Sequence, residues 1–231
     1  MKKYKYAAFV VLIAVALAGA TALAKLQGQQ PEKTVNERKI LVEAMRRGGF
    51  REVAKIKGHY VATADPNWDW SSFDLESLTK TSNAVIVGYA GEGHGKLNPT
   101  GDVITTEYDL TVKDVLKGKL VNGDTVKVAL IGGKVDFDDG TSAEVQTPGF
   151  ERMAQGKEYV VFLYPNKNGS SVFLVTGGPQ GLFEITDSGI KAHARATDAV
   201  ANQVSNKTVE TFLNEIRTLS AKWPQAEECC R

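Results

Sequence analysis

The part of the sequence that most constrains the fold is a pair of apolar runs in the C-terminal half. Tyr159–Leu163 and Val172–Val175 consist of β-branched, aromatic and other apolar residues, and a turn-forming cluster at 165–170 separates them. This pattern predicts a β-hairpin. Because both runs are apolar throughout instead of alternating with polar residues, we expect both faces of the strands to be covered. One cover would be the interior of a barrel or sandwich, and the other would be helices.

The neighbouring sequence predicts further strands around this hairpin. Apolar residues alternate along a stretch of unusual length at 105–116, where the alternation slips near Lys113 and Asp114 as a bend or bulge would cause. Gly91–Lys96 follows the first expected strand, and we interpret it as a hairpin tip. Shorter runs with strand character occur at 84–89, 125–131, 182–185 and 190–194. The fold class expected from these elements is mainly β.

Helices are expected on both sides of the β region. Val209, Phe212 and Ile216 keep helical spacing, with Ser205 or Asn206 as the cap and Trp223–Pro224 as the end. Two shorter helices are expected before the strands. One begins at the capping box Thr34–Glu37 and stops at Gly48–Gly49, and one covers 73–80 with a serine cap at 71–72. The stretch 50–64 fits neither helix nor strand throughout, and its assignment stays open.

The first 24 residues have the features of a signal peptide. Lys2, Lys3 and Lys5 precede an apolar stretch, and Ala22–Leu23–Ala24 has the small residues of a cleavage site. We therefore expect export and cleavage before Lys25. The alternative is an uncleaved membrane anchor, because the apolar stretch is about long enough to span a bilayer. In either case the bulk of the chain is expected outside the cytoplasm, in the periplasm or the extracellular space.

Charge and cysteine content restrict the possible partners. Removal of the three leader lysines changes the formal net charge from +1 to −2, which gives no general attraction to nucleic acid. Contact with the membrane is expected only through the N-terminal segment, if it is not cleaved. Cys229 and Cys230 are adjacent at the chain end, so this pair provides no disulfide bond that would stabilise the core. They either belong to a frayed tail or serve in pairing between molecules or in metal capture.

A family resemblance follows from turn glycines and strands in a particular order. The landmarks are 84–88, 108–118, 123–128, 131–133, Phe150, 156–163 and 180–183. Between Leu75 and Ile185 the chain resembles the small OB-fold-like barrels of exported bacterial proteins, which are similar in outline to the netrin-like and tissue-inhibitor-of-metalloproteinase (TIMP-like) domain. The resemblance implies a small barrel with flanking helices, and a β-sandwich is the alternative. The inhibitory N-terminal cysteine of that family is not matched, because the expected mature chain begins Lys25–Leu26–Gln27.

Two tryptophans and one histidine are candidate ligand-binding residues. Trp68 and Trp70 lie beside acids in a proline-containing segment, where they either stack on a ligand or plug the edge of a core. His94 lies within Gly91–Lys96, which fails as a phosphate-binding loop because Leu97 follows the lysine. No motif in the sequence indicates a cofactor, and no catalytic residue can be assigned from a motif.

A second candidate is an acidic cluster that could hold a cation. Asp136, Asp138 and Asp139, with Glu144 beyond, bring carboxylates together, although their spacing differs from that of an EF-hand. The alternative is an acidic, solvated turn.

The sequence therefore predicts a leader (1–24), a linker and N-terminal helical extension (25–74), a β-barrel domain (75–194) and a C-terminal helix with a tail (195–231). We expect an exported, non-enzymatic binding module of the cell envelope, with an envelope protein or peptide as the possible partner. The alternative is a periplasmic enzyme, or a peptidase-associated accessory domain, that uses His94, Asp102 and Glu107 at one barrel end. This alternative requires the three residues to converge.

Overall fold

A computed structural model describes residues 31–64, 73–148, 150–166 and 171–224, with side chains from residue 35 onward. The predicted leader, the tryptophans at 68 and 70 and the two cysteines lie outside these residues. The helical elements are α2 (Pro31–Lys57), α3 (Leu75–Thr81), the 3-10 turn η2 (Gly178–Gly181), α4 (Ala199–Val204) and α5 (Val209–Lys222). The strands are β1 (His59–Thr63), β2 (Ala84–Leu97), β3 (Ile104–Lys117), β4 (Thr125–Ile131), β5 (Gly133–Asp136), β6 (Ser142–Gln146), β7 (Glu158–Pro165), β8 (Val172–Val175), β9 (Leu182–Thr186) and β10 (Gly189–Ala192).

Five strands of the larger sheet form a closed ring. The sheet has the order β10-β9-β7-β2-β3-β4-β8, and an additional pairing of β8 with β7 closes the last five strands of this order into a ring. All pairings are antiparallel except that of β4 with β8. The predicted hairpin is confirmed, because β7 pairs with β8 in the register Leu163↔Val175. The mainly β fold predicted from the sequence is therefore confirmed, with the hairpin as the closing element of the ring.

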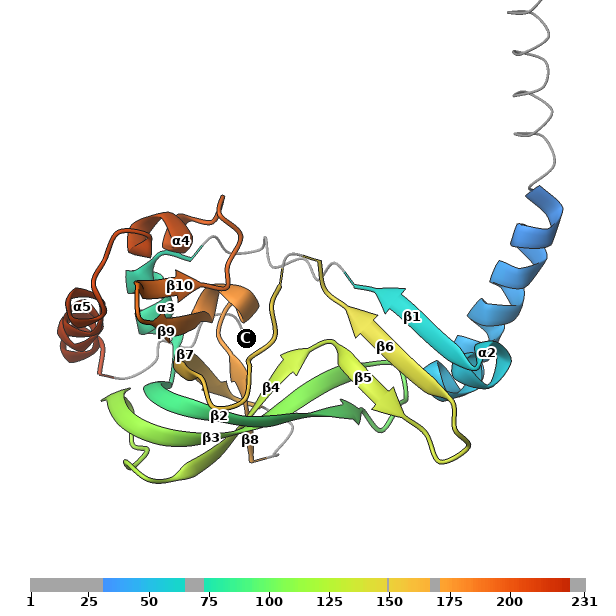
Figure 1. The fold of residues 1–231 in the computed structure, drawn as a ribbon, viewed down its shortest axis with the longest axis horizontal. Helices are drawn as coiled ribbons and strands as arrows, with labels where there is room; N and C mark the ends of the chain where they lie inside the picture. The colour runs from blue at the N-terminus through green and yellow to red at the C-terminus, as the bar shows by residue number, and fades with distance from the viewer. Residues whose placement is uncertain (1–30, 65–72, 149, 167–170, 225–231) are drawn as a thin grey trace, which may run out of the picture.

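A second, three-stranded sheet lies beside the ring and has the order β1-β6-β5. In Figure 1 it occupies the side of the molecule on which α2 lies, whereas α3, α4 and α5 gather at the opposite side of the ring. β1 and β6 are parallel, and β5 and β6 are antiparallel. Phe50 and Ala54 of α2 pack with Ala143 and Val145 of β6 into a small core of this part of the molecule.

β7 is buried on both faces, as its composition predicts. Tyr159 and Val161 belong to the core inside the ring. Phe162 belongs to the outer core, where its ring packs edge-on against Phe183 at 5.7 Å between centroids. Phe183 in turn lies 5.0 Å from the ring of Phe212 in α5. The C-terminal helix therefore covers the outside of the ring, and removal of one of these buried aromatic side chains would cost about 3–5 kcal/mol.

The predicted irregularity of β3 is present. Along the β2–β3 ladder the partner changes from Asp114, opposite Val87, to Val112, opposite Gly88, so Lys113 is left without an opposite residue. A bulge of this kind bends a strand. The bend lets one long strand pair with β2 and β4, which lie on two sides of the ring.

Local assignments near the helices and the first hairpin differ from the predictions. Asp74, not a serine before it, caps α3, and it exchanges hydrogen bonds with Ser77 in a capping box. Thr208 caps α5 and accepts from the Thr211 amide. Gly91–Lys96 is part of β2 instead of a hairpin tip, because the chain turns only at 98–103. The two capping errors arise because several neighbouring Ser, Thr and Asp residues can cap equally well by composition.

The first helix of α2 stops at Gly48–Gly49, the end that the sequence predicts. Gly48 and Gly49 have non-helical backbone angles, with φ +67° and ψ −149° at Gly49, so they separate two helices within the bounds of α2. The Phe50 amide then donates to the Gly101 carbonyl oxygen at 2.7 Å. The stretch that the sequence left open is therefore the second half of α2 followed by β1.

The small sheet meets the ring at a close backbone contact. A Cβ atom at Gly95 of β2 would lie only 1.7 Å from the carbonyl oxygen of Lys134 in β5. Only glycine leaves room for this contact, so the end of the β2–β3 hairpin covers the outer edge of β5.

Replacing Gly95 with alanine should separate the two sheets at this contact. Because the clash is with backbone, β5 has to move, and we expect the free energy of unfolding to fall by about 2–3 kcal/mol. Urea denaturation measures this change. Gly48→Ala is the matched control, since its Cβ would meet only the flexible side chain of Glu52. An equal effect of the two substitutions would contradict the close-contact explanation.

A hydrogen bond from His193 holds the segment that connects the two sheets. Its side chain is 1% exposed, and its Nδ1 donates to the Glu151 carbonyl oxygen at 2.9 Å. The ring packs edge-on against Tyr159. Nε2 has no hydrogen-bond partner among the described residues, and the nearest carboxylate oxygen of Glu184 is 3.9 Å away. The buried ring is therefore held in its neutral form, and burial lowers the pKa of His193 below the ordinary value of 6.5.

This lowered pKa predicts a loss of stability in mild acid. The unfolded chain takes up a proton at this histidine below about pH 6.5, whereas the folded chain does so only at lower pH. The free energy of unfolding should therefore decrease as the pH falls from about 7 to 5. Urea denaturation at several pH values measures the slope, and His193→Gln should flatten it. A slope that is equally steep in the variant would contradict this role.

Candidate functional site: the outer edge of strand β1

The three residues of the predicted catalytic alternative do not share a hydrogen-bond network. His94 is exposed on β2, directly opposite Glu107 of β3. Asp102 lies in the turn beyond both strands, where it accepts bonds from the Thr100 hydroxyl at 2.5 Å and the Asn98 amide at 2.8 Å. These bonds lower the pKa of Asp102. Within the described residues no hydrogen bond or ion pair joins any two of His94, Asp102 and Glu107.

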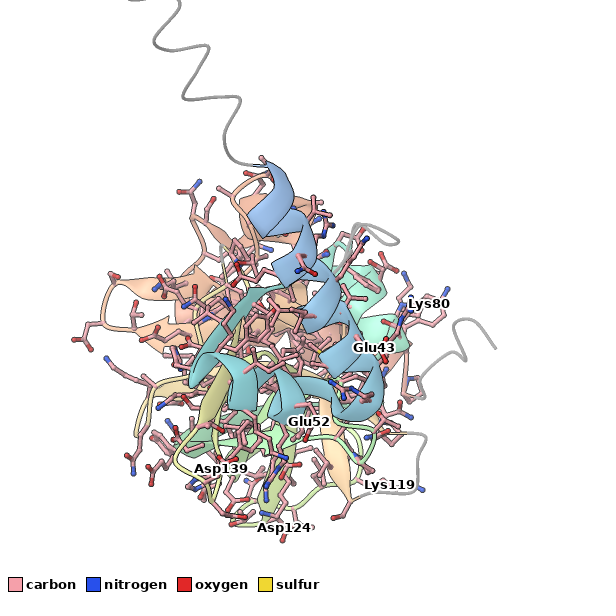
Figure 2. All side chains as sticks on the ribbon, turned by 90° about the vertical axis from the view of Figure 1, so that its right-hand side faces the viewer. Glu43, Glu52, Lys80, Lys119, Asp124 and Asp139 are labelled. Carbon is pink, nitrogen blue, oxygen red and sulfur yellow. The ribbon has the colours of Figure 1, made fainter. Side chains whose placement is uncertain are left out.

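The acidic residues predicted to hold a metal each have a separate partner. Asp136 pairs with Lys134 at 2.7 Å, and Asp138 lies 3.7 Å from Arg51. Asp139 accepts from the Thr141 hydroxyl at 2.6 Å, a bond that lowers the pKa of Asp139. Figure 2 shows Asp139 near the periphery of the molecule. In the part of the chain that the structure describes, no three acidic, histidine or cysteine side chains are placed to hold a metal ion together.

The other two predicted ligand-binding residues, Trp68 and Trp70, lie outside the described residues. They follow β1 closely in the chain, which directs attention to that strand.

Among the strands that the structure describes, three have an edge that ring closure does not remove, and two of these edges are protected. β10 packs against α4 and α5, and its Lys191 forms an ion pair with Glu151. The outer edge of β5 lies against β2 at Gly95, as described above. β1 is the terminal strand of the small sheet, on its side away from the ring (Figure 1). Among the described residues no strand pairs with the outer edge of β1.

The backbone of β1 offers hydrogen-bonding groups along this edge. The Gly58 carbonyl oxygen accepts from the Ser142 amide at 3.0 Å, and the Ala64 amide donates to the Gln146 carbonyl oxygen at 2.9 Å. These two bonds set the phase of the parallel ladder, in which every second residue bonds to β6. The residues between them, His59, Val61 and Thr63, direct their N–H and C=O groups away from β6 and are exposed.

The side chains of β1 leave the edge accessible and uncharged. Tyr60 and Ala62 are directed into the small core beneath α2. On the other face, His59 Nδ1 lies 2.6 Å from the Ser142 hydroxyl, and Val61 is 43% exposed. Proteins usually protect an exposed edge with lysine, proline or a bulge. The sequence His59–Thr63 contains no lysine or proline, and its register on β6 has no bulge.

Charge and apolar surface flank this edge at the C-terminal end of α2. Ile56 is 49% exposed. Lys57 is paired with Glu37, and Lys55 donates to Glu52 at 2.6 Å, a bond that lowers the pKa of Glu52. Neither lysine therefore contributes an unpaired charge beside β1. The edge can accept an extended polypeptide strand, since backbone hydrogen bonds would supply affinity and the exposed side chains would supply selectivity.

Sequence reasoning missed this edge because the stretch 50–64 shows no clear periodicity. The signal that could have found it is the short uncharged run His59–Thr63 between two glycine- or proline-containing segments. Its pairing with β6, about 80 residues later, cannot be inferred from local pattern.

Comparison with known proteins adds no family assignment: no protein-family model matches the chain, and no curated protein matches it. Among the described residues, none of the helices is long and apolar enough to cross a membrane.

Proposed function

We propose that this protein is an exported, non-enzymatic binding module of the cell envelope, which takes an extended peptide segment of an envelope protein onto the outer edge of β1. Export is inferred from the predicted leader and its cleavage before Lys25. The binding role rests on one observation, the unprotected backbone edge at His59, Val61 and Thr63.

We further propose that the five-stranded ring is an OB-fold-like barrel of the TIMP-like type. Support comes from the number of strands, the closure through β7 and β8, and the long bent strand β3. OB-fold barrels are small five-stranded barrels of this kind, partly open and mainly antiparallel. In this proposal the ring is the stable support, and the small sheet attached to it presents the binding edge.

An extended peptide fits this edge better than a small molecule or nucleic acid does. A row of alternating N–H and C=O groups is complementary to the backbone of another strand. The exposed side chains of β1 include no lysine, arginine or carboxylate, and the predicted mature chain has a formal charge of −2, which opposes binding of polyanions.

Peptides selected from a displayed library of short random sequences provide a direct test. The expected binders become strands along β1, so Val61→Pro should weaken their affinity about 10-fold or more, because proline removes one outward N–H and blocks close approach. The bonds of β1 to β6 should survive, since the Val61 amide does not take part in them. Calorimetric titration of a selected peptide measures the change.

Two lysine variants distinguish a loss of peptide binding from a loss of folding. Val61→Lys adds a charge beside the edge and should also weaken the peptide, whereas Val121→Lys, at a 62% exposed valine far from β1, should not. Retention of full affinity in both Val61 variants would refute the proposed site.

A further inference from the structure

A small pocket lies where the C-terminal end of β3 meets α5. α5 lies on the side of the ring away from the small sheet (Figure 1). The pocket's volume is about 320 Å³, and it is broadly open to solvent. Lys117, Gly118, Arg217, Ser220 and Pro224 contribute to its walls. The pocket is distant from β1 in the fold, so it is independent of the proposed peptide edge.

Lys117 lines this pocket, and its ammonium group bonds to backbone carbonyl oxygens only. The residue is 4% exposed, and its Nζ donates to the Thr79 carbonyl oxygen at 2.5 Å and lies 3.5 Å from that of Lys80. Both carbonyls belong to the last turn of α3. Within the described residues no carboxylate forms an ion pair with Lys117. Burial lowers the pKa of Lys117, and an ammonium group has three donors, so one donor remains available.

Two residues of α5 add donors to the same pocket. Ser220 is 7% exposed, and its hydroxyl has no hydrogen-bond partner among the described residues. Arg217 donates to Asn214 at 3.0 Å and to Asp114 at 2.8 Å. Its guanidinium carries five N–H groups, so several stay free after these contacts. A buried hydroxyl left unsatisfied is costly, and a ligand acceptor would remove that cost.

The balance of charge and surface indicates the kind of ligand. Lys117 and Arg217 provide two positive charges, and Asp114 cancels one of them. The remaining single charge matches one carboxylate. Val115 and Leu116 line the pocket with apolar surface beside these donors. We propose that the pocket binds a carboxylate attached to a short apolar group, which accepts hydrogen bonds from Lys117, Ser220 and Arg217.

Such a carboxylate can belong to a free small acid or to the C-terminus of a peptide, and the probes distinguish these sources. Butyrate represents the free acid. The tripeptide Ala-Ala-Leu represents a C-terminus, and the same tripeptide with a C-terminal amide lacks the negative charge. Chemical-shift titration of the isotope-labelled protein should show saturable binding of butyrate, of the free tripeptide, or of both, with shifts at Ser220 and the Lys117 side chain. The amide should not bind.

Variants test the assigned donors. Lys117→Met and Ser220→Ala should each weaken the binding probe, by about 10-fold or more for the lysine and less for the serine. Lys119→Met and Thr218→Ala are the matched controls, as neither residue lines the pocket. Lys117→Met also removes a hydrogen bond to the C-terminal end of α3. Ser220→Ala leaves that bond in place, so it tests the pocket separately.

The proposal is overturned if neither butyrate nor the free tripeptide binds, if the amide binds as well as the acid, or if both pocket variants keep wild-type affinity. Tighter binding of inorganic phosphate than of either carboxylate would overturn the assigned ligand class.

Discussion

The pairing of β7 with β8 is the interaction on which the rest of the structure depends. Without it the larger sheet would have free edges at β8 and along part of β7, whereas with it five strands form a ring whose backbone groups bond to one another. Closure is the most complete way in which a sheet removes its edges. It also makes β7 a strand with apolar cover on both faces, which explains the uninterrupted apolar sequence Tyr159–Leu163.

The sequence predicts the elements of the ring better than it predicts the three-stranded sheet. The hairpin, the bent strand and the C-terminal helix depend on local periodicity and turn residues, which a single sequence displays directly. The three-stranded sheet depends on pairing between β1 and a strand about 80 residues later, and no local pattern encodes that contact. The glycines predict the break at Gly48–Gly49, but the contact of Gly49 with Gly101 is non-local and does not follow from them.

The features on which the proposed sites rest do not follow from residue type, for a physical reason. His94 and the aspartates are candidate site residues because of their residue type. Exposed side chains of those types readily form contacts with neighbouring residues, as Asp136 does with Lys134. The features that distinguish this molecule are backbone groups at the edge of β1 and a buried lysine without a carboxylate partner among the described residues. Neither feature is visible before the chain is folded.

The most direct test of this account is the exchange of individual backbone amides with solvent in the free protein, measured by NMR. If the edge of β1 is open, the amides of His59, Val61 and Thr63 should exchange fast, while those of Tyr60 and Ala62, which bond to β6, should be protected together with the strands of the ring. Equal protection along the whole of β1 would show that another segment covers this edge. It would contradict the central claim that the fold leaves one strand available for a partner.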